Sequence, residues 1–217
     1  MAEENFTEFL NDYLYLFASR STSASIRFET DTDAEKAENA LMFEGNLKAI
    51  KYLFRLGEDI LRPDIIQEIA RKVDYESNSK GFRTVNIEVG GSNVKRSDTK
   101  QIYPHIYSLL DNYYNVWSAI EDPYLKEAYF HINFLHIHPF EDGNGRVARI
   151  MTAYNLYKSG EVCFVITKED KENYNQCIEQ SNYVGMADLF KKLAKEEKLV
   201  IDQLYEKYSL EKHRGRK

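Results

Sequence analysis

The sequence has few of the residues that mark secreted or membrane-spanning proteins. Its 217 residues include two cysteines, four prolines and one tryptophan. Cys163 and Cys177 form no metal-binding spacing and are too few for a disulfide scaffold, so a reducing compartment is the simpler interpretation. No run reaches the ~18 apolar residues of a membrane helix. The acidic start, residues 1–5, is unlike a signal peptide. We therefore expect a cytoplasmic protein without a membrane partner.

Positive charge is also in short supply. Lys and Arg number 29 against 35 Asp and Glu, for a net charge of −6. Proteins that mainly bind nucleic acid need surplus cations to neutralise phosphates, so this class is disfavoured. The one basic run, residues 212–217, is expected to be a solvated tail.

What the chain has is a repeated helical pattern. The four prolines, Pro63, Pro104, Pro123 and Pro139, divide it at intervals that suit helix starts and breaks. Apolar residues recur at spacings of three and four between them, which predicts amphipathic helices. The expected helical ranges are 40–58, 63–73, 104–120, 124–137, 145–158 and 186–207.

One segment follows a different period. Apolar and polar side chains alternate, and a Gly-Gly turn at residues 90–93 and then Val94 follow them. This alternation is typical of a strand, a turn and a return strand. The first strand would consist of Val85, Asn86, Ile87, Glu88 and Val89. We therefore expect an all-α bundle with one small β-hairpin flap. At roughly 150 residues per domain, the length suits one domain with an extension.

Residues 138–149 concentrate the chemistry. They read His-Pro-Phe-Glu-Asp-Gly-Asn-Gly-Arg-Val-Ala-Arg, between two predicted helices. The glycines of Gly143-Asn144-Gly145 permit a tight turn at a helix start, which favours anion binding by backbone N–H groups. Arg146 and Arg149 share a helix face, and guanidinium groups suit phosphate oxygens. Asp142 offers a carboxylate for magnesium, and His138 has the ordinary pKa of a general base.

These residues resemble the signature of the Fic family, His-Pro-Phe-x-Asp/Glu-Gly-Asn-Gly-Arg-x-x-Arg, at every specified position. The likeness continues in residues 129–137, in Gly81-Phe82-Arg83 with the hairpin, and at Tyr174. It covers about residues 40–195. The resemblance implies a domain of that extent, an N-terminal helical extension over 1–39, and a C-terminal helix with the basic tail over 196–217.

The resemblance implies a protein adenylyltransferase, which moves AMP from ATP to a Ser, Thr or Tyr hydroxyl of a target protein. His138 would take the hydroxyl proton and Asp142 would hold Mg²⁺ or Mn²⁺. Phosphates would lie on Gly143, Asn144 and Gly145, with Arg146 at the α- and β-phosphates and Arg149 at the γ-phosphate. Tyr174 would line the nucleotide base. The hairpin would bind an extended target segment by strand addition, and with 16 tyrosines in the chain self-modification stays open.

Many relatives carry an inhibitory helix of pattern Ser/Thr-x-x-x-Glu-Gly/Asn, whose glutamate pairs with the second motif arginine. Residues 40–46 match at Glu44 and Gly45 but have Ala40 where Ser or Thr is expected. The rival segment, residues 25–29, has Ser25 and Glu29 but lacks the following Gly or Asn. We prefer Glu44. Inhibited relatives are sometimes dimers, so a homodimer stays open.

Three alternatives compete with AMP transfer from ATP. The same site could remove AMP or transfer another nucleotide, and a dead site could serve a toxin–antitoxin pair. The intact His138, Asp142 and Arg149 weigh against the dead site. A zinc site made of His131, His136 and His138 is disfavoured, because spacings of five and two do not share one helical face.

Overall fold

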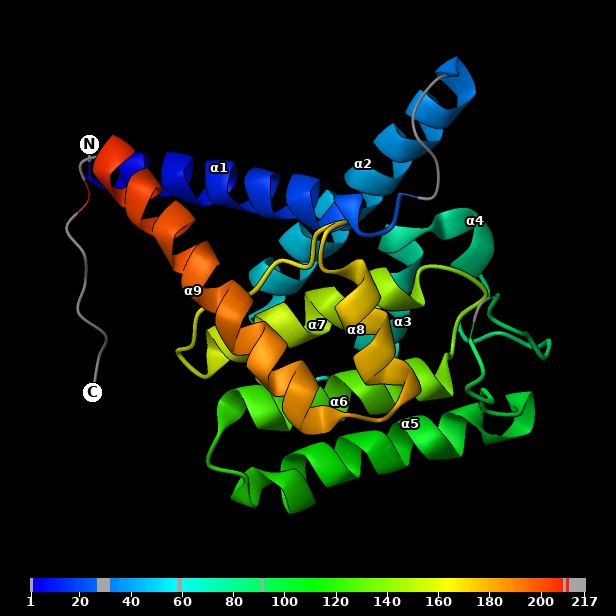
Figure 1. Cartoon of the computed structure of the whole chain (residues 1–217). Helices are drawn as coiled ribbons and strands as arrows, with labels where there is room; N and C mark the ends of the chain where they lie inside the picture. Colours follow the sequence, from blue (N-terminus) through cyan, green and yellow to red (C-terminus); the bar gives the residue numbers. More distant parts are fainter. Residues whose placement is uncertain (1, 27–31, 58–59, 91, 209, 211–217) are drawn as a thin grey trace.

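The computed structural model describes residues 2–26, 32–57, 60–90, 92–208 and 210. It confirms an all-α architecture (Figure 1). The helices are α1 (Ala2–Ser23), α2 (Asp33–Leu56), α3 (Pro63–Val73), α4 (Tyr75–Asn78), α5 (Ile102–Asp111), α6 (Pro123–Ile137), α7 (Asn144–Lys158), α8 (Lys171–Glu179) and α9 (Tyr183–Lys207). A 3₁₀ turn, Thr99–Gln101, precedes α5. A π turn, Asn112–Val116, and a 3₁₀ turn, Trp117–Ala119, follow it.

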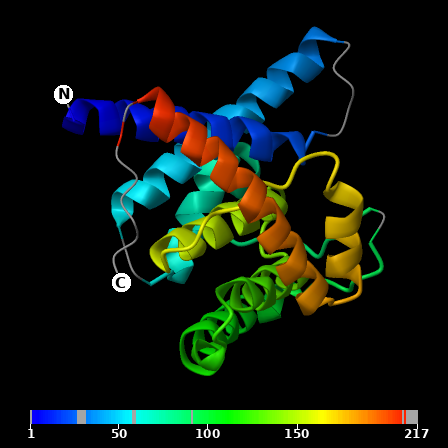
Figure 2. The same ribbon diagram turned by 60° about the vertical axis from the view of Figure 1, so that its left-hand side comes forward.

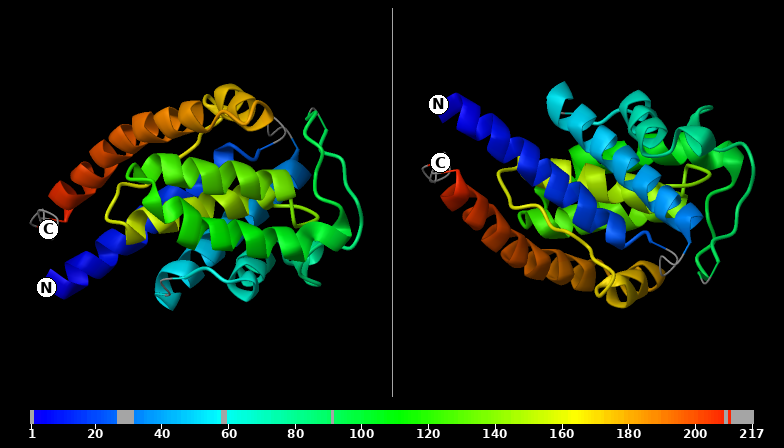
Figure 3. Two further views of the ribbon diagram at one scale, coloured as in Figure 1. Left: turned by 90° about the horizontal axis from the view of Figure 1, so that it is seen from below. Right: turned by 90° about the horizontal axis from the view of Figure 1, so that it is seen from above.

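The core forms around α6 and α7, which pack on each other near the middle of the molecule (Figures 1 and 3). Nearly every side chain of α7 is buried, and eight residues of α6 are. Helices buried on all sides lack a strong apolar stripe, which is why the pattern of these two reads less clearly than that of α3. Helices α5 and α9 cover α6, whereas α2 and α3 cover α7.

Two long-range contacts attach the outer helices. Arg20 of α1 donates to the Glu197 carboxylate of α9 at 2.7 Å, and Glu197 is buried. At the crossing of α2 and α3, Gly45 lies directly on α3, because a Cβ there would come within 2.3 Å of the Val73 carbonyl oxygen. The helix starts and breaks follow the prolines, with Pro63 and Pro123 each at a helix start.

The first half of α2 projects beyond the rest of the body (Figures 1 and 2). A capping box stabilises its free end, since the Thr32 hydroxyl accepts from the Glu35 N–H and the Glu35 carboxylate accepts from the Thr32 N–H. Helix α2 is therefore longer than the predicted range of 40–58, and the predicted boundary at residue 40 lies inside it. The boundary at residue 196 likewise lies within α9.

The predicted hairpin does not form strands in the part of the chain that the structure describes. Residues 82–98, here called the flap loop, extend from the body at the end opposite the start of α1 (Figure 3). Arg83 replaces the missing ladder, because its guanidinium donates to the Val85 carbonyl at 2.8 Å and the Ser97 carbonyl at 2.5 Å. Two isolated strands are marginal in water. Here a buried side chain ties the two arms together instead.

No helix among the described residues is long and apolar enough to cross a membrane.

Candidate active site

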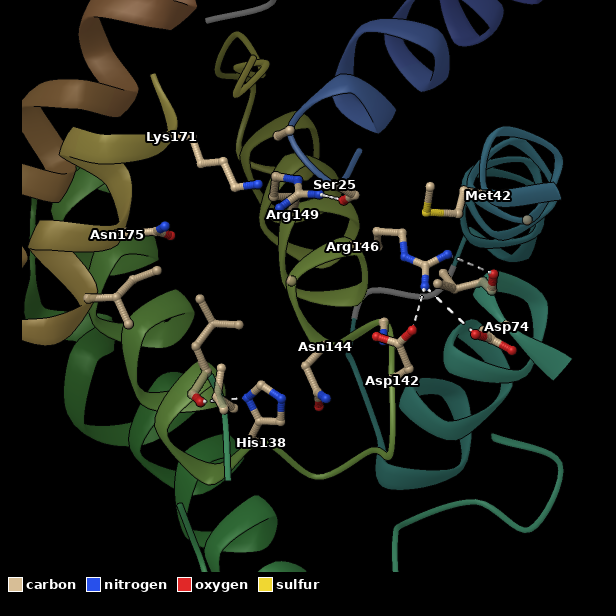
Figure 4. Close-up of a pocket in the computed structure, with 18 of the residues that line it drawn as sticks. Ser25, Met42, Asp74, His138, Asp142, Asn144, Arg146, Arg149, Lys171 and Asn175 are labelled. Carbon is tan, nitrogen blue, oxygen red and sulfur yellow. Dashed lines mark hydrogen bonds and ion pairs between the residues drawn. The ribbon is translucent and has the colours of Figure 1, made fainter. Parts of the chain in front are cut away.

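His138 ends α6 in an unusual backbone conformation. Its φ is 52° and its ψ is 61°, the left-handed region that residues other than glycine rarely occupy. The proline that follows disfavours further helix, and the His138 N–H still donates to the Phe134 carbonyl at 3.0 Å. Such a conformation costs on the order of 1 kcal/mol and persists only where the surroundings enforce it. Its effect is to direct the imidazole into a cavity that the motif residues line (Figure 4).

The hydrogen bond of the His138 ring defines its free nitrogen. Nδ1 lies 3.3 Å from the Leu135 carbonyl oxygen, which can only accept. Nδ1 therefore carries the proton, and the other ring nitrogen, Nε2, is left as the base on the pocket side (Figure 4). Burial, with the nearby Arg96, lowers the pKa of His138 from 6.5 to about 4. The ring is neutral at pH 7, as a general base must be.

The turn after Phe140 is held by Asn144. Its side chain accepts from the Phe140 N–H at 3.0 Å and donates to the Phe140 carbonyl at 2.9 Å. Gly143 has a φ of 79°, and a Cβ there would come within 2.9 Å of Val73. The turn thus needs glycine for its conformation and for the close approach of α3. Helix α7 begins directly afterwards, with its N-terminus on the cavity.

Arg146 is a buried cation with anionic partners. Its Nη2 lies 3.6 Å from the Asp142 carboxylate and 3.8 Å from that of Asp74, and Nη1 donates to the Val73 carbonyl at 3.3 Å. Only 6% of the residue is exposed. The guanidinium therefore faces two carboxylates, which offset its charge (Figure 4).

Arg149, one turn further along α7, is similarly buried at 5% exposure but has no anionic partner among the residues that the structure describes. Its Nη2 donates to the Ser25 hydroxyl at 2.6 Å, and the Ser21 carbonyl lies at 3.5 Å. Its Nε is buried without a hydrogen-bond partner. Among the described residues no carboxylate lies within 4 Å of it. A buried guanidinium without a counter-ion is costly, and an anion in the cavity would relieve that cost.

The other predicted histidines make separate contacts. His131 is fully buried between Thr152, at 2.9 Å from Nδ1, and the Tyr174 hydroxyl, at 2.6 Å from Nε2. Burial lowers its pKa to about 3. His136 meets the Ile178 carbonyl at 2.9 Å. No cluster of three metal-ligating side chains occurs in the described part of the chain.

One cavity of about 790 Å³ collects most of the predicted site residues. It is lined by His138, Asp142, Gly143, Asn144, Gly145, Arg146, Arg149, Tyr174, Glu44 and Val89. Its volume suits a nucleotide-sized ligand. The motif residues lie together in this cavity, as their spacing in the sequence predicts. Residues of α2, α8 and the flap loop form further walls. Of the predicted flap residues, Val85, Asn86, Ile87 and Glu88 lie outside this lining.

The structure adds lining residues that the sequence did not single out. Lys171 and Asn175 project from α8 into the cavity (Figure 4). Tyr174, the residue predicted to line the base, is buried at 5% exposure with its hydroxyl on His131. No sequence motif surrounds its neighbour Asn175, so the sequence alone did not identify Asn175 as a lining residue. The role predicted for Tyr174 stays a prediction.

Glu44 and Ser25 both line the cavity, from different elements. The Glu44 carboxylate pairs with Lys48 at 3.2 Å, one turn along α2. Ala40 is exposed, and it is Ser25, after α1, that reaches Arg149. Glu29 of the rival segment lies outside the described residues. The inhibitory role of Glu44 stays a prediction.

Comparison with known proteins gives a family match. Residues 60–156 match the model of the Fic/DOC family. The chain is 29% identical over 148 residues to a protein named "Protein adenylyltransferase Fic" from Nematostella vectensis, covering 63% of this chain and 33% of that protein. It is 30% identical over 145 residues to the protein of that name from Aedes aegypti, covering 62% and 28%. The chain thus spans about a third of these relatives.

Solved structures share the fold at lower identity. A Fic-domain-containing signalling protein from Bacteroides thetaiotaomicron superposes with a TM-score of 0.77 at 19% identity, covering 96% of this chain and 93% of that one. IbpAFic2, solved in complex with adenylylated Cdc42, gives a TM-score of 0.60 at 17% identity, covering 89% and 70%. These likenesses establish the fold across nearly the whole chain.

Proposed function

Because residues 60–156 form a Fic domain, we propose that the protein is an adenylyltransferase that moves AMP from ATP to a hydroxyl of a target protein and releases pyrophosphate. The observation that carries this proposal is the buried Arg149. It has no carboxylate partner among the described residues and lies in one cavity with a neutral, correctly protonated His138. The cavity thus contains a general base and a buried cation that an anionic ligand would stabilise.

The chemistry follows from these two groups. Nε2 of His138 takes the proton of the target hydroxyl while the hydroxyl oxygen attacks the α-phosphorus of ATP. The bond between that phosphorus and the bridging oxygen breaks, and pyrophosphate leaves with the electron pair. Phosphoryl chemistry depends mostly on positioning and charge stabilisation, which Arg146, Arg149 and the N-terminus of α7 are placed to supply.

The residues present also fit a magnesium ion. Mg²⁺ in nucleotide sites usually takes one or two carboxylates and the phosphate oxygens. Asp142 offers a carboxylate whose side chain is 43% exposed, next to the turn that begins α7. When bound, the ion would neutralise phosphate charge. Because Asp142 now faces Arg146, ion binding would change the surroundings of that arginine as well.

The flap loop is the element placed to receive the target. Val89, Gly90 and Ser92 line the cavity, and the described part of the loop forms no strand. An extended target segment can use such backbone for hydrogen bonds without a demanding sequence. Self-modification of exposed tyrosines such as Tyr75, at the cavity rim, falls within the same proposal.

One test is intact-protein mass spectrometry of the purified protein after incubation with ATP and Mg²⁺. A second test adds labelled ATP and a lysate that contains candidate targets, and measures the label on protein. We expect label to transfer to protein in the parent and to be lost in His138→Ala. Lys158→Ala, at the far end of α7 and outside the cavity, serves as the matched control. Transfer by His138→Ala at the parent rate would contradict the assignment of the base.

We further propose that Glu44 restrains the enzyme. The carboxylate lies in the cavity wall within one helical turn of Gly45, and restraint requires it to exchange Lys48 for Arg149. Glu44→Gly should then increase the transfer rate, whereas Glu38→Gly, another acid of the same wall, should not. Equal rates in parent and Glu44→Gly would contradict the inhibitory role of Glu44.

A further inference from the structure

A second arginine lies beside His138, and it comes from the flap loop. Nη1 of Arg96 donates to the Leu135 carbonyl at 3.1 Å, the same oxygen that accepts from His138 Nδ1. Nη2 donates to the Ser92 hydroxyl at 2.6 Å, within the loop. Nε is buried without a partner, and the side chain lines the cavity. The Leu135 carbonyl therefore joins the loop to the imidazole through two donors.

The loop end that carries Arg96 is also attached to α8. The Ser92 hydroxyl donates to the Glu179 carboxylate, which accepts from the Asn93 N–H as well, at 2.9 Å. This chain of contacts runs from α8 through the loop to the end of α6. It fixes where the guanidinium of Arg96 lies relative to His138.

Among the described residues, three charged groups act on the His138 ring. Arg96 comes from the loop, Arg83 from the base of the loop, and Asp142 from the turn before α7. The two arginines disfavour the imidazolium and Asp142 favours it, and burial adds to the effect of the arginines. Arg83 is fixed by its own backbone contacts, including the His138 carbonyl at 2.8 Å. Arg96 is the cation whose position depends on the loop.

We propose that Arg96 is a positioning residue for His138. It shares the Leu135 carbonyl, keeps the ring neutral with Nε2 free, and makes this state depend on the placement of the flap loop. The contacts of Arg96 are present in the free protein and do not depend on the proposed function. Only the catalytic use of His138 as a base rests on that function. Once the ring has taken the target's proton, the same cation favours its release, which returns the base to its starting state.

NMR titration of the His138 imidazole in the full chain tests the proposal without any transfer assay. Removing a neighbouring cation makes the imidazolium easier to form, so Arg96→Met should raise the pKa of His138 by roughly one unit. Arg96→Lys, which retains the charge, should restore most of the difference. Lys95→Met removes the adjacent, exposed cation and should leave the titration unchanged.

Two outcomes would overturn the proposal. The first is an unchanged titration in Arg96→Met with its amide spectrum intact. The second is an unchanged titration in Ser92→Ala, which keeps the guanidinium but removes its hydrogen bond to the loop, since the state of the ring would then not depend on loop placement. If transfer is measurable, the acid limb of kcat/KM should move with the titration. If the parent transfers nothing while the titration shifts as expected, the proposed function fails and the Arg96 inference stands.

Discussion

Replacing Arg149 by methionine should stabilise the free protein and weaken its stabilisation by ATP. In the free protein the substitution removes a buried cation whose Nε has no partner, and it forfeits the hydrogen bond to Ser25 at 2.6 Å. An unmet buried donor costs about 1–3 kcal/mol, and an unpaired buried charge adds to that cost. A hydrogen bond from a charged group returns about 1.5–3 kcal/mol. We expect a net gain of about 1 kcal/mol.

For a chain of this size, about 1 kcal/mol corresponds to a rise in Tm of roughly 2–4 °C. With ATP the sign reverses. At about 100 times Kd, a ligand stabilises its protein by about 2.7 kcal/mol. Loss of a charged contact of about 1.5–3 kcal/mol lowers the affinity by roughly 10- to 150-fold, so about half to nine tenths of that shift should vanish in Arg149→Met.

Arg146→Met is the matched control, because Arg146 lies one turn away on the same helix and is 6% exposed. Its removal leaves Asp74 and Asp142 facing each other, and their side chains are 23% and 43% exposed, so we expect a modest loss of about 1 kcal/mol. Differential scanning fluorimetry with and without ATP and Mg²⁺ measures both signs. If Arg149→Met lowers the Tm of the free protein as Arg146→Met does, Arg149 is satisfied in the free state and the argument fails.

Two further predictions concern stability. Because His138 has a φ of 52°, His138→Gly should be more stable to urea than His138→Ala by about 1 kcal/mol, and equal midpoints would show that the turn is not strained. Glu127, fully buried with Tyr113 and Asn155, has its pKa raised by burial to about 7, so the folded protein holds a proton that the unfolded chain releases near pH 4.5. Stability is therefore lost as pH rises from 4.5 to 7, by at most about 3 kcal/mol, and Glu127→Gln should remove that slope in urea titrations at pH 5 and 8.

The helices of the core were predictable because their cause is local. Proline positions and apolar spacing place the ranges 124–137 and 145–158 within one residue of α6 and α7. The motif residues could also be predicted to meet, since His138 and Arg149 lie on the two sides of a single turn. Residues on the two sides of a short turn are held close together by the covalent chain.

The flap loop could not be predicted in this way. Its alternation of Val85, Ile87 and Val89 favours a strand, but the residues that hold it act from elsewhere. Arg83 takes carbonyls on both arms, and Glu179 binds the far end from a position 87 residues away from Ser92. Side chains that hydrogen-bond to backbone groups compete with the hydrogen bonds between two strands. The alternation of apolar and polar residues gives no information about that competition.

The difference between Arg146 and Arg149 was beyond the reach of the sequence for the same reason. Their spacing of three makes them equivalent, as two guanidinium groups on one face. Among the described residues, the fold supplies carboxylates to Arg146 from the turn before α7 and from Asp74 at the end of α3, whereas Arg149 contacts the Ser25 hydroxyl, 124 residues earlier, and the Ser21 carbonyl. An anion that reaches Arg149 must therefore compete with the Ser25 hydroxyl. Nucleotide binding is thereby linked to Ser25, which lines the same cavity as Glu44.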